Sequence, residues 1–261
     1  MMALLTVTKL SKQFGGLDAV ADVDMHVDAG ELVALIGPNG AGKTTLFNLL
    51  TGVTPATSGK VTLTTASGKV ALLGKRPSDI AKLGLARTFQ NIRLFSKLSV
   101  RDNLQAAMTH RYHENFFAEI LRLPAYYKKE ALVGGWTDAL LREFDLTAVA
   151  DLDAGNLPYG TQRRVEIARA AATAPRIIFL DEPAAGMNPE ETAGLRELIE
   201  KLRTDFQLTV VLIEHDMSLV MNLAERIYVL DHGKMIAEGT PAQIQKDPAV
   251  IAAYLGGGVH A

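Results

Sequence analysis

Residues 33–44 read VALIGPNGAGKT, a short apolar run that leads directly into a glycine-rich segment. The last eight of these residues match the pattern G-x-x-x-x-G-K-[ST] in full, and TLFNLLTG (45–52) follows as a helical pattern. Gly37, Gly40 and Gly42 allow the backbone to curl, so that successive N–H groups surround phosphate oxygens. The alternative is a glycine-rich turn with a chance Lys-Thr, which the flanking strand and helix disfavour. The segment therefore predicts a phosphate-binding loop in an α/β fold.

This loop predicts a nucleotide triphosphate and Mg²⁺ as ligands. The Lys43 ammonium can reach the β- and γ-phosphates, and the Thr44 hydroxyl can ligate Mg²⁺. The loop residues expected around the nucleotide are Gly37, Pro38, Asn39, Gly40, Ala41, Gly42, Lys43 and Thr44.

Other apolar runs predict the sheet that carries this loop. Strands are expected at 33–36, 177–180, 209–213 and 227–230. The first three are continuously apolar, which is typical of strands covered on both faces. A helix is expected at 190–206, with Leu195, Leu198, Ile199 and Leu202 at helical spacing. The pattern predicts an α/β core with a mostly parallel sheet.

The beginning and the middle of the chain differ from this core. Antiparallel strands are expected at 4–10, 20–27 and 61–73, with Ser67-Gly68 as a hairpin turn. Residues 92–155 show helical patterning and are interpreted as an inserted helical subdomain. The whole chain, 1–261, is expected to form a single domain with this insert.

The composition narrows the classes of protein. The chain is 48% hydrophobic, which supports a sizeable core, and its formal net charge of -2 gives no general attraction to nucleic acid. Cysteine is absent, so disulfides and thiolate metal sites are excluded. The opening residues are not typical of a signal peptide, and no apolar run reaches the ~18 residues that span a bilayer. Any membrane association is expected to go through a partner.

Two carboxylates end the strand in IIFLDEP (177–183). Asp181 can hold Mg²⁺ through water, as expected beside a phosphate loop. Glu182 points elsewhere and can accept a proton from a water that attacks the γ-phosphate. A solvated strand end is the alternative, and the phosphate loop favours catalysis.

His215 follows another predicted strand. The carboxyl ends of strands in such sheets converge on the ligand crevice, so His215 is expected level with Asp181 and the loop. There it could hydrogen-bond a γ-phosphate oxygen or the attacking water. The alternative is a surface or capping histidine.

The order of these motifs resembles the ATP-binding subunits of ABC transporters over the whole chain. Within that superfamily the chain looks most like the larger ATPase of the branched-chain amino acid importers. The supporting stretches are TKLSKQFGGLDAV (8–20), GLARTFQNIRLF (84–95), DEPAAGMNPEET (181–192), EHDMSLVMNLAERIYVL (214–230), EGTPAQIQKDPAVIAAYLG (238–256) and a long insert near 108–144.

The resemblance implies further roles. Phe14 matches the aromatic residue that stacks on adenine, although a core Phe is the alternative. Gln90 matches the loop glutamine that touches Mg²⁺ or the attacking water, and Thr45 matches the second hydroxyl of the phosphate loop. Asn188 stands where the short loop that crosses between subunits usually carries Asp, which removes a charge.

LPYGTQ (157–162) occupies the place of the family signature, usually Leu-Ser-Gly-Gly-Gln. Pro158, Tyr159 and Thr161 replace the usual Ser, first Gly and Gln, while Gly160 is retained. Pro158 lacks the hydroxyl and N–H that Ser offers a γ-phosphate. The N–H groups of Gly160, Thr161 and Gln162 are expected to remain available. We therefore expect a helix start that contacts the ATP of a second subunit.

The resemblance implies an ATPase that energises an importer from the cytoplasmic face of the membrane. Its implied partners are transmembrane permeases, a second ATPase subunit that shares the ATP, and indirectly a periplasmic solute-binding protein. Exposed apolar residues near Leu94, Phe95 and Leu98 would dock a permease helix, with subdomain core as the alternative. The alternative classes of protein are an exporter, a urea or amide importer, a soluble ABC-type ATPase on ribosomes or DNA, and a non-catalytic ATP sensor. Glu182 and His215 disfavour the last of these, and the absence of tandem cassettes disfavours the soluble class.

Overall fold

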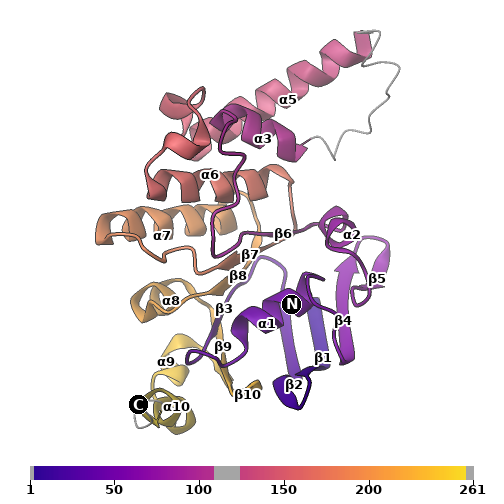
Figure 1. Cartoon of the computed structure of the whole chain (residues 1–261), viewed down its shortest axis with the longest axis vertical. Coiled ribbons are helices and arrows are strands. Elements are labelled where there is room, and N and C mark those ends of the chain that lie inside the picture. Colours follow the sequence, from indigo (N-terminus) through magenta and orange to yellow (C-terminus); the bar gives the residue numbers. More distant parts are fainter. Residues whose placement is uncertain (1–2, 109–123, 257–261) are drawn as a thin grey trace. The chain divides into compact units, whose positions relative to one another are not determined.

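The computed structural model describes residues 3–108 and 124–256, which form two compact units (Figure 1). The first unit combines Met1–Arg87 with Arg176–Ala261, and the second is Thr88–Pro175. The predicted helical insert, 92–155, falls inside the second unit. Part of the long insert expected near 108–144 lies outside the described residues.

A six-stranded sheet forms the centre of the first unit, in the order β10-β9-β3-β8-β7-β6. Only β10 pairs antiparallel, with β9, so the prediction of a mostly parallel sheet is confirmed. Every residue of β3, β7 and β8 is buried, as their apolar runs predict. The strand bounds are Leu32–Ile36 (β3), Leu85–Arg87 (β6), Ile177–Asp181 (β7), Thr209–Ile213 (β8), Arg226–Asp231 (β9) and Lys234–Gly239 (β10).

The second sheet of this unit is antiparallel, in the order β2-β1-β4-β5, as predicted. Its strands are Ala3–Phe14 (β1), Leu17–Asp28 (β2), Ser58–Thr65 (β4) and Gly68–Ala71 (β5). The predicted Ser67-Gly68 turn is wrong by one residue, because Gly68 already pairs with Thr65 and the loop is Ala66-Ser67. Gly68 supplies a positive φ of 118° directly after the loop, where glycine is unstrained.

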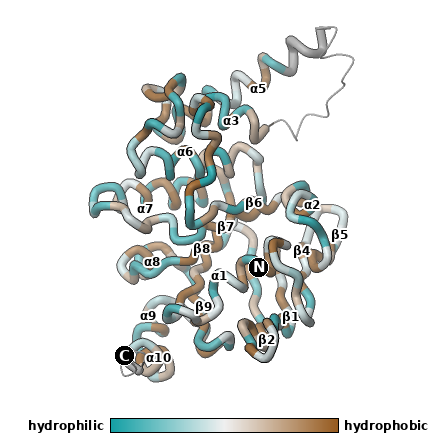
Figure 2. Tube along the Cα trace, viewed as in Figure 1, coloured by the Kyte–Doolittle hydropathy of each residue, from teal (hydrophilic) through white to brown (hydrophobic). Residues whose placement is uncertain are grey.

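One apolar cluster joins the two sheets of the first unit. It includes Leu5 and Val27 of the antiparallel sheet, Phe47 of helix α1 (Lys43–Leu50), and Phe179 and Tyr228 of the central sheet. In Figure 2 the strands around β8 and β9 are drawn mainly in the brown of hydrophobic residues. The helix after the phosphate loop is therefore anchored in the core at its apolar face.

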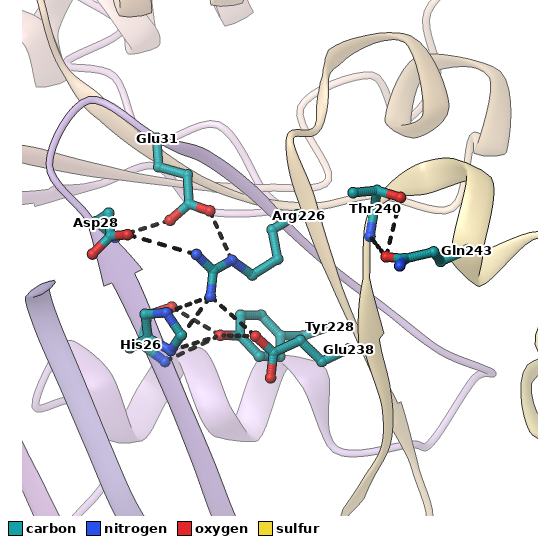
Figure 3. A network of polar contacts seen from close by, with 8 residues as sticks. All are labelled: His26, Asp28, Glu31, Arg226, Tyr228, Glu238, Thr240 and Gln243. Carbon is teal, nitrogen blue, oxygen red and sulfur yellow. Dashed lines mark hydrogen bonds and ion pairs between the residues drawn. The ribbon is translucent and has the colours of Figure 1, made fainter. Parts of the chain in front are cut away.

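A polar network fixes the amino end of β9 to its neighbours (Figure 3). Arg226 donates to Glu31 Oε1 at 2.8 Å and to Glu238 Oε1 at 3.0 Å, and it also contacts His26. Tyr228 donates its hydroxyl to the His26 carbonyl at 3.0 Å, and burial raises the pKa of Tyr228 to about 12. These contacts tie the antiparallel sheet to the central sheet at the amino ends of β3 and β9.

Helices complete both units. In the first unit they are α1, α2 (Pro77–Lys82), α7 (Pro189–Thr204), α8 (Met217–Leu223), α9 (Pro241–Ile244) and α10 (Pro248–Gly256). The second unit holds α3 (Val100–Met108), α5 (Pro124–Glu143) and α6 (Tyr159–Ala172), with 3-10 turns η2 (Thr147–Val149) and η3 (Ala154–Asn156). Asn188 caps α7 in a capping box with Glu191. In the described part of the chain, no helix has both the length and the apolar character to cross a membrane.

Candidate nucleotide-binding site

The glycine-rich loop between β3 and α1 has the backbone that its sequence predicts. Gly37, Gly40 and Gly42 have φ values of 149°, 80° and 102°, which L side chains rarely adopt. A Cβ atom at Gly37 would lie 1.9 Å from the Leu230 carbonyl oxygen, and one at Gly42 would lie 2.4 Å from the Ala19 carbonyl oxygen. Gly37 and Gly42 are thus required by close backbone packing as well as by their dihedral angles.

Lys43 is held inside the curve of this loop. Its Nζ donates to the carbonyls of Gly37 at 2.8 Å and Pro38 at 2.9 Å, and the residue is only 6% exposed. Burial lowers the pKa of Lys43, while the carboxylates of Glu182 and Asp181 act in the opposite direction. The loop therefore places a cation close to two carboxylates.

An open cavity of about 480 Å³ lies over the loop. Its lining comes from the end of β1, the start of β2, the loop and α1, and the residues that follow β7, β8 and β9. The predicted site residues among this lining are Phe14, Asn39, Gly40, Ala41, Gly42, Lys43, Thr44, Thr45, Glu182 and His215. Segments as far apart in the sequence as Phe14 and Gly233 thus meet at one concave site.

Phe14 lies on the rim of the cavity at the end of β1. It is 51% exposed, and the Lys12 ammonium lies 4.8 Å from the centroid of its ring. The alternative of a core Phe is therefore wrong. An exposed ring is what stacking on a nucleobase requires, and that role remains a prediction.

Glu182 and His215 form a direct pair at the carboxyl ends of neighbouring strands. His215 Nε2 lies 2.9 Å from Glu182 Oε1. The strands β7 and β8 pair in parallel with Asp181 opposite Ile213, so the residues just beyond them emerge at the same edge. Glu182 also has a left-handed φ of 48°, and its N–H donates to the Ile213 carbonyl at 2.9 Å. The backbone thus turns out of the sheet where a carboxylate is expected to act as a base.

Glu214 supports this pair and was not predicted as a site residue. Its buried carboxylate accepts from the N–H of Ala184 at 2.6 Å and of His215 at 3.1 Å. Burial raises the pKa of Glu214, although these hydrogen bonds oppose the shift. An acidic residue at the end of an apolar strand, beside His215, was the sequence signal that could have identified it.

The donors expected for Mg²⁺ have suitable chemistry. Mg²⁺ prefers oxygen ligands and is commonly held by one or two carboxylates together with substrate phosphates. Asp181, 2% exposed at the end of β7, and Thr44 in the first turn of α1 supply such oxygens. Among the described residues no cluster of three or more His, Cys, Asp or Glu could hold a metal ion.

The signature stretch lies in the second unit, at the start of α6. Pro158 is the N-cap, so the unbonded donors of the first turn are the N–H groups of Tyr159, Gly160 and Thr161. The expectation that the Gln162 N–H is available is wrong, because it donates to the Pro158 carbonyl at 2.9 Å and closes the first turn. The Gln162 amide donates to the Leu157 carbonyl at 2.8 Å.

Gln90 lies in the same unit as α6, and its backbone is fixed by a fully buried arginine. Arg163 donates to the carbonyls of Phe89 and Gln90, both at 2.8 Å, and to Glu166 Oε2 at 2.7 Å. The Tyr159 hydroxyl lies 3.1 Å from the same guanidinium. The sequence presents Arg163 in a polar and basic run, so its burial was missed. The roles of Gln90 and of residues 158–162 toward ATP remain predictions.

The proposed docking residues for a permease differ in exposure. Phe95 and Leu98 are 54% and 40% exposed, whereas Leu94 is half-buried. The Arg169 guanidinium lies 5.6 Å from the Phe95 ring centroid. Phe95 and Leu98 are therefore not core residues of the second unit.

Comparison with known proteins places these features in a family. Residues 20–185 match the family model "ABC transporter", and residues 234–260 match "Branched-chain amino acid ATP-binding cassette transporter". The chain is 46% identical to the high-affinity branched-chain amino acid transport ATP-binding protein BraF of Pseudomonas aeruginosa, over 97% of this chain and 98% of that protein. It is 36% identical to the lipopolysaccharide export system ATP-binding protein LptB of Escherichia coli, over 98% of each.

A solved structure shows the same fold. The ADP conformation of MJ1267, described as an ATP-binding cassette of an ABC transporter, superposes with a TM-score of 0.83 at 30% identity. The match covers 98% of this chain and 100% of that one.

Proposed function

Since this chain belongs to the ABC transporter family of ATP-binding proteins, of the branched-chain amino acid transporter type, we propose that it is the ATPase that drives import of branched-chain amino acids. The observation that carries the proposal is the cavity over the phosphate loop, which is lined by the Glu182–His215 pair. The loop N–H groups and the Lys43 cation can bind the phosphates, and the Glu182 carboxylate can accept a proton from water, as hydrolysis of a γ-phosphate demands. The His215 imidazole holds that carboxylate in place.

In this mechanism Lys43 and the loop N–H groups bind the β- and γ-phosphates, and Phe14 stacks on the adenine. The Lys43 ammonium would exchange its hydrogen bonds to the Gly37 and Pro38 carbonyls for hydrogen bonds to phosphate oxygens, so it keeps hydrogen-bond partners throughout. Thr44 and Asp181 would hold Mg²⁺, which when bound neutralises charge on the phosphates.

Glu182 then accepts a proton from the attacking water. His215 holds the Glu182 carboxylate at 2.9 Å and orients it toward the cavity. Glu214 accepts hydrogen bonds from the N–H groups of Ala184 and His215, so it fixes the backbone near Glu182 and that of His215.

The assembly that we propose pairs this chain with a second ATPase subunit and with permeases. The start of α6, with the N–H groups of Tyr159, Gly160 and Thr161, would face the γ-phosphate held by the other ATPase subunit. Phe95 and Leu98 would contact a permease on the cytoplasmic face of the membrane, and a periplasmic protein would deliver the solute. ATP binding and hydrolysis would then change the separation of the two ATPase subunits.

An exporter is the second candidate, because the LptB relative is described as part of an export system. Its identity of 36% is lower than the 46% of BraF, and the match at 234–260 favours the amino acid importers.

The test uses a tag on this chain to purify its complex from membranes of the cells that produce it, and then measures transport by that complex. In proteoliposomes with ATP inside, the proposal expects leucine, isoleucine and valine to enter only when the captured solute-binding protein is present. Urea serves as the control solute. Capture of the complex with urea uptake, or with export of a lipid and no amino acid uptake, would contradict the proposed substrate.

A further inference from the structure

Arg87 connects the two halves of the predicted magnesium site. It ends β6, the edge strand of the central sheet, and its side chain is only 7% exposed. Its Nη2 donates to Asp181 Oδ2 at 2.8 Å. Its Nη1 donates to Asn48 Oδ1 on α1 at 2.7 Å and to Oγ1 of Thr51, the residue that follows the helix as its C-cap, at 2.9 Å. One guanidinium thus bridges the end of β7 and the helix that follows the phosphate loop.

The sheet register explains why these groups meet. Arg87 pairs with Phe179 in the parallel β6–β7 ladder, and Phe179 lies on the same face of β7 as Asp181 because strand side chains alternate. Helix α1 covers this face, with the Phe47 ring edge-on to Phe179 at 5.2 Å. The Arg87 guanidinium lies 5.8 Å from the Phe47 ring centroid, within reach of a cation–π contact.

The face of α1 that Arg87 contacts also carries the predicted magnesium hydroxyl. Asn48 lies four residues after Thr44, and Thr51 lies three residues after Asn48. At this spacing the three side chains lie along one face of the helix. We propose that Arg87 is a positioning residue, which sets the Asp181 carboxylate at a fixed place relative to Thr44 and thereby prepares the Mg²⁺ site of this ATPase. This inference rests on the proposed function.

The charge and shape of arginine suit this position. Asp181 is 3% exposed at its side chain, and a buried carboxylate is costly without a paired cation. The planar guanidinium offers several donors in a fixed fork, so it can bind Asp181, Asn48 and Thr51 together. A lysine would keep the charge but could not hold all three partners in that geometry.

The test measures how much Mg²⁺ tightens ATP binding to the isolated chain. All variants carry Glu182→Gln, which blocks turnover, and ATP is titrated calorimetrically with MgCl₂ or with EDTA. Arg87→Met should reduce the Mg²⁺-dependent gain in affinity by about tenfold and leave the Kd in EDTA within about twofold of the parent. Arg87→Lys should give an intermediate gain, because it restores the charge alone.

Two further variants separate positioning from stability. Arg226→Met removes another arginine that is paired with carboxylates. Arg226 lies at the amino end of β9, whereas Asp181 lies at the carboxyl end of β7, so the two residues are at opposite ends of the parallel strands. Arg226→Met should lower Tm and leave the Mg²⁺-dependent gain unchanged. Asn48→Ala keeps the ion pair and removes one anchor, so it should reduce the gain in the same direction as Arg87→Met, even if Arg87→Met does not fold.

If Arg87→Met and Asn48→Ala both kept the Mg²⁺-dependent gain in ATP affinity of the parent, the positioning role of Arg87 would be overturned. Arg87 would then only form a structural ion pair with Asp181. Equal loss of affinity in MgCl₂ and EDTA would overturn the positioning role as well, because the defect would then lie in the phosphate loop. No ATP binding by the parent in either buffer would overturn the proposed function itself, and this assignment with it.

Discussion

His215 Nε2 lies 2.9 Å from Glu182 Oε1, and the two residues are the first side chains to reach the cavity beyond two adjacent parallel strands. The pair is unequal in exposure, with 44% of the His215 side chain and 15% of the Glu182 side chain accessible. The histidine is therefore the more exposed partner, and the carboxylate is largely buried where it lines the cavity. This arrangement makes the pair a unit in which each residue orients the other.

His215→Ala should lower ATP turnover by at least about tenfold, which corresponds to about 1.4 kcal/mol of transition-state stabilisation. The reason is that Glu182 loses the partner that fixes its carboxylate. The ATP Kd of the isolated chain should change little, because the phosphate loop is intact. Turnover at the wild-type rate would show that Glu182 needs no orientation by His215.

Lys43→Ala should weaken ATP binding by at least about tenfold, or about 1.4 kcal/mol, because the ammonium inside the loop meets the triphosphate. Isothermal titration measures the change. Lys69→Ala, on an exposed position of β5, is the matched control and should bind ATP as the wild type does. An unchanged Kd for Lys43→Ala would contradict the loop assignment.

Glu214→Gln should gain stability relative to the wild type as the pH rises. Burial raises the pKa of Glu214 in the fold, so the native state retains a proton that the unfolded chain loses near its ordinary pKa of 4.5. Wild-type stability from this group is therefore present below the unfolded pKa and declines as pH rises through the folded pKa. The glutamine variant lacks this decline.

Urea unfolding of both proteins at pH 5 and at pH 7.5 measures the effect. The free energy of unfolding of Glu214→Gln minus that of the wild type should be more positive at pH 7.5. A difference that does not depend on pH would mean that Glu214 is not destabilised by its charge.

Gly160→Asp should leave ATP affinity of the isolated chain nearly intact and abolish hydrolysis by the assembled transporter. It adds bulk and negative charge in the first turn of α6, which we propose faces the other subunit's γ-phosphate. Gly135→Asp on α5 is the matched control, because a Cβ there would meet nothing within 4 Å. Pro158→Ser should be tolerated, since serine also caps helices. Full transporter activity in Gly160→Asp would show that this helix start does not face a phosphate.

The sequence was sufficient to predict the phosphate loop, the buried strands and the Glu182–His215 edge. Local patterns carry this information, because a fully apolar run identifies β3, β7 or β8 and the motif follows its strand directly. The two short or polar strands, β6 and β10, were not predicted, since three residues or a half-polar run give no clear periodicity.

The partners of the site residues could not be predicted from such patterns. Arg87 and Asp181 are 94 positions apart and meet only through the register of β6 and β7. Arg163 reads as a surface residue in a basic run, although the fold buries it against the Gln90 backbone. The Gln162 N–H was misassigned because the signature does not show where the helix begins. With Pro158 as the N-cap, the Gln162 N–H already closes the first turn.

Measuring both ATP binding and ATP turnover in Glu182→Gln tests most directly whether this chain is an ATPase with Glu182 as its base. The amide keeps the size of the side chain but cannot accept the proton of the attacking water, which is expected to cost about 10²-fold or more in turnover. We predict that the variant binds ATP with the wild-type Kd, hydrolyses it at no more than a hundredth of the wild-type rate, and supports no leucine uptake in proteoliposomes. Hydrolysis and leucine uptake at wild-type rates would contradict this prediction.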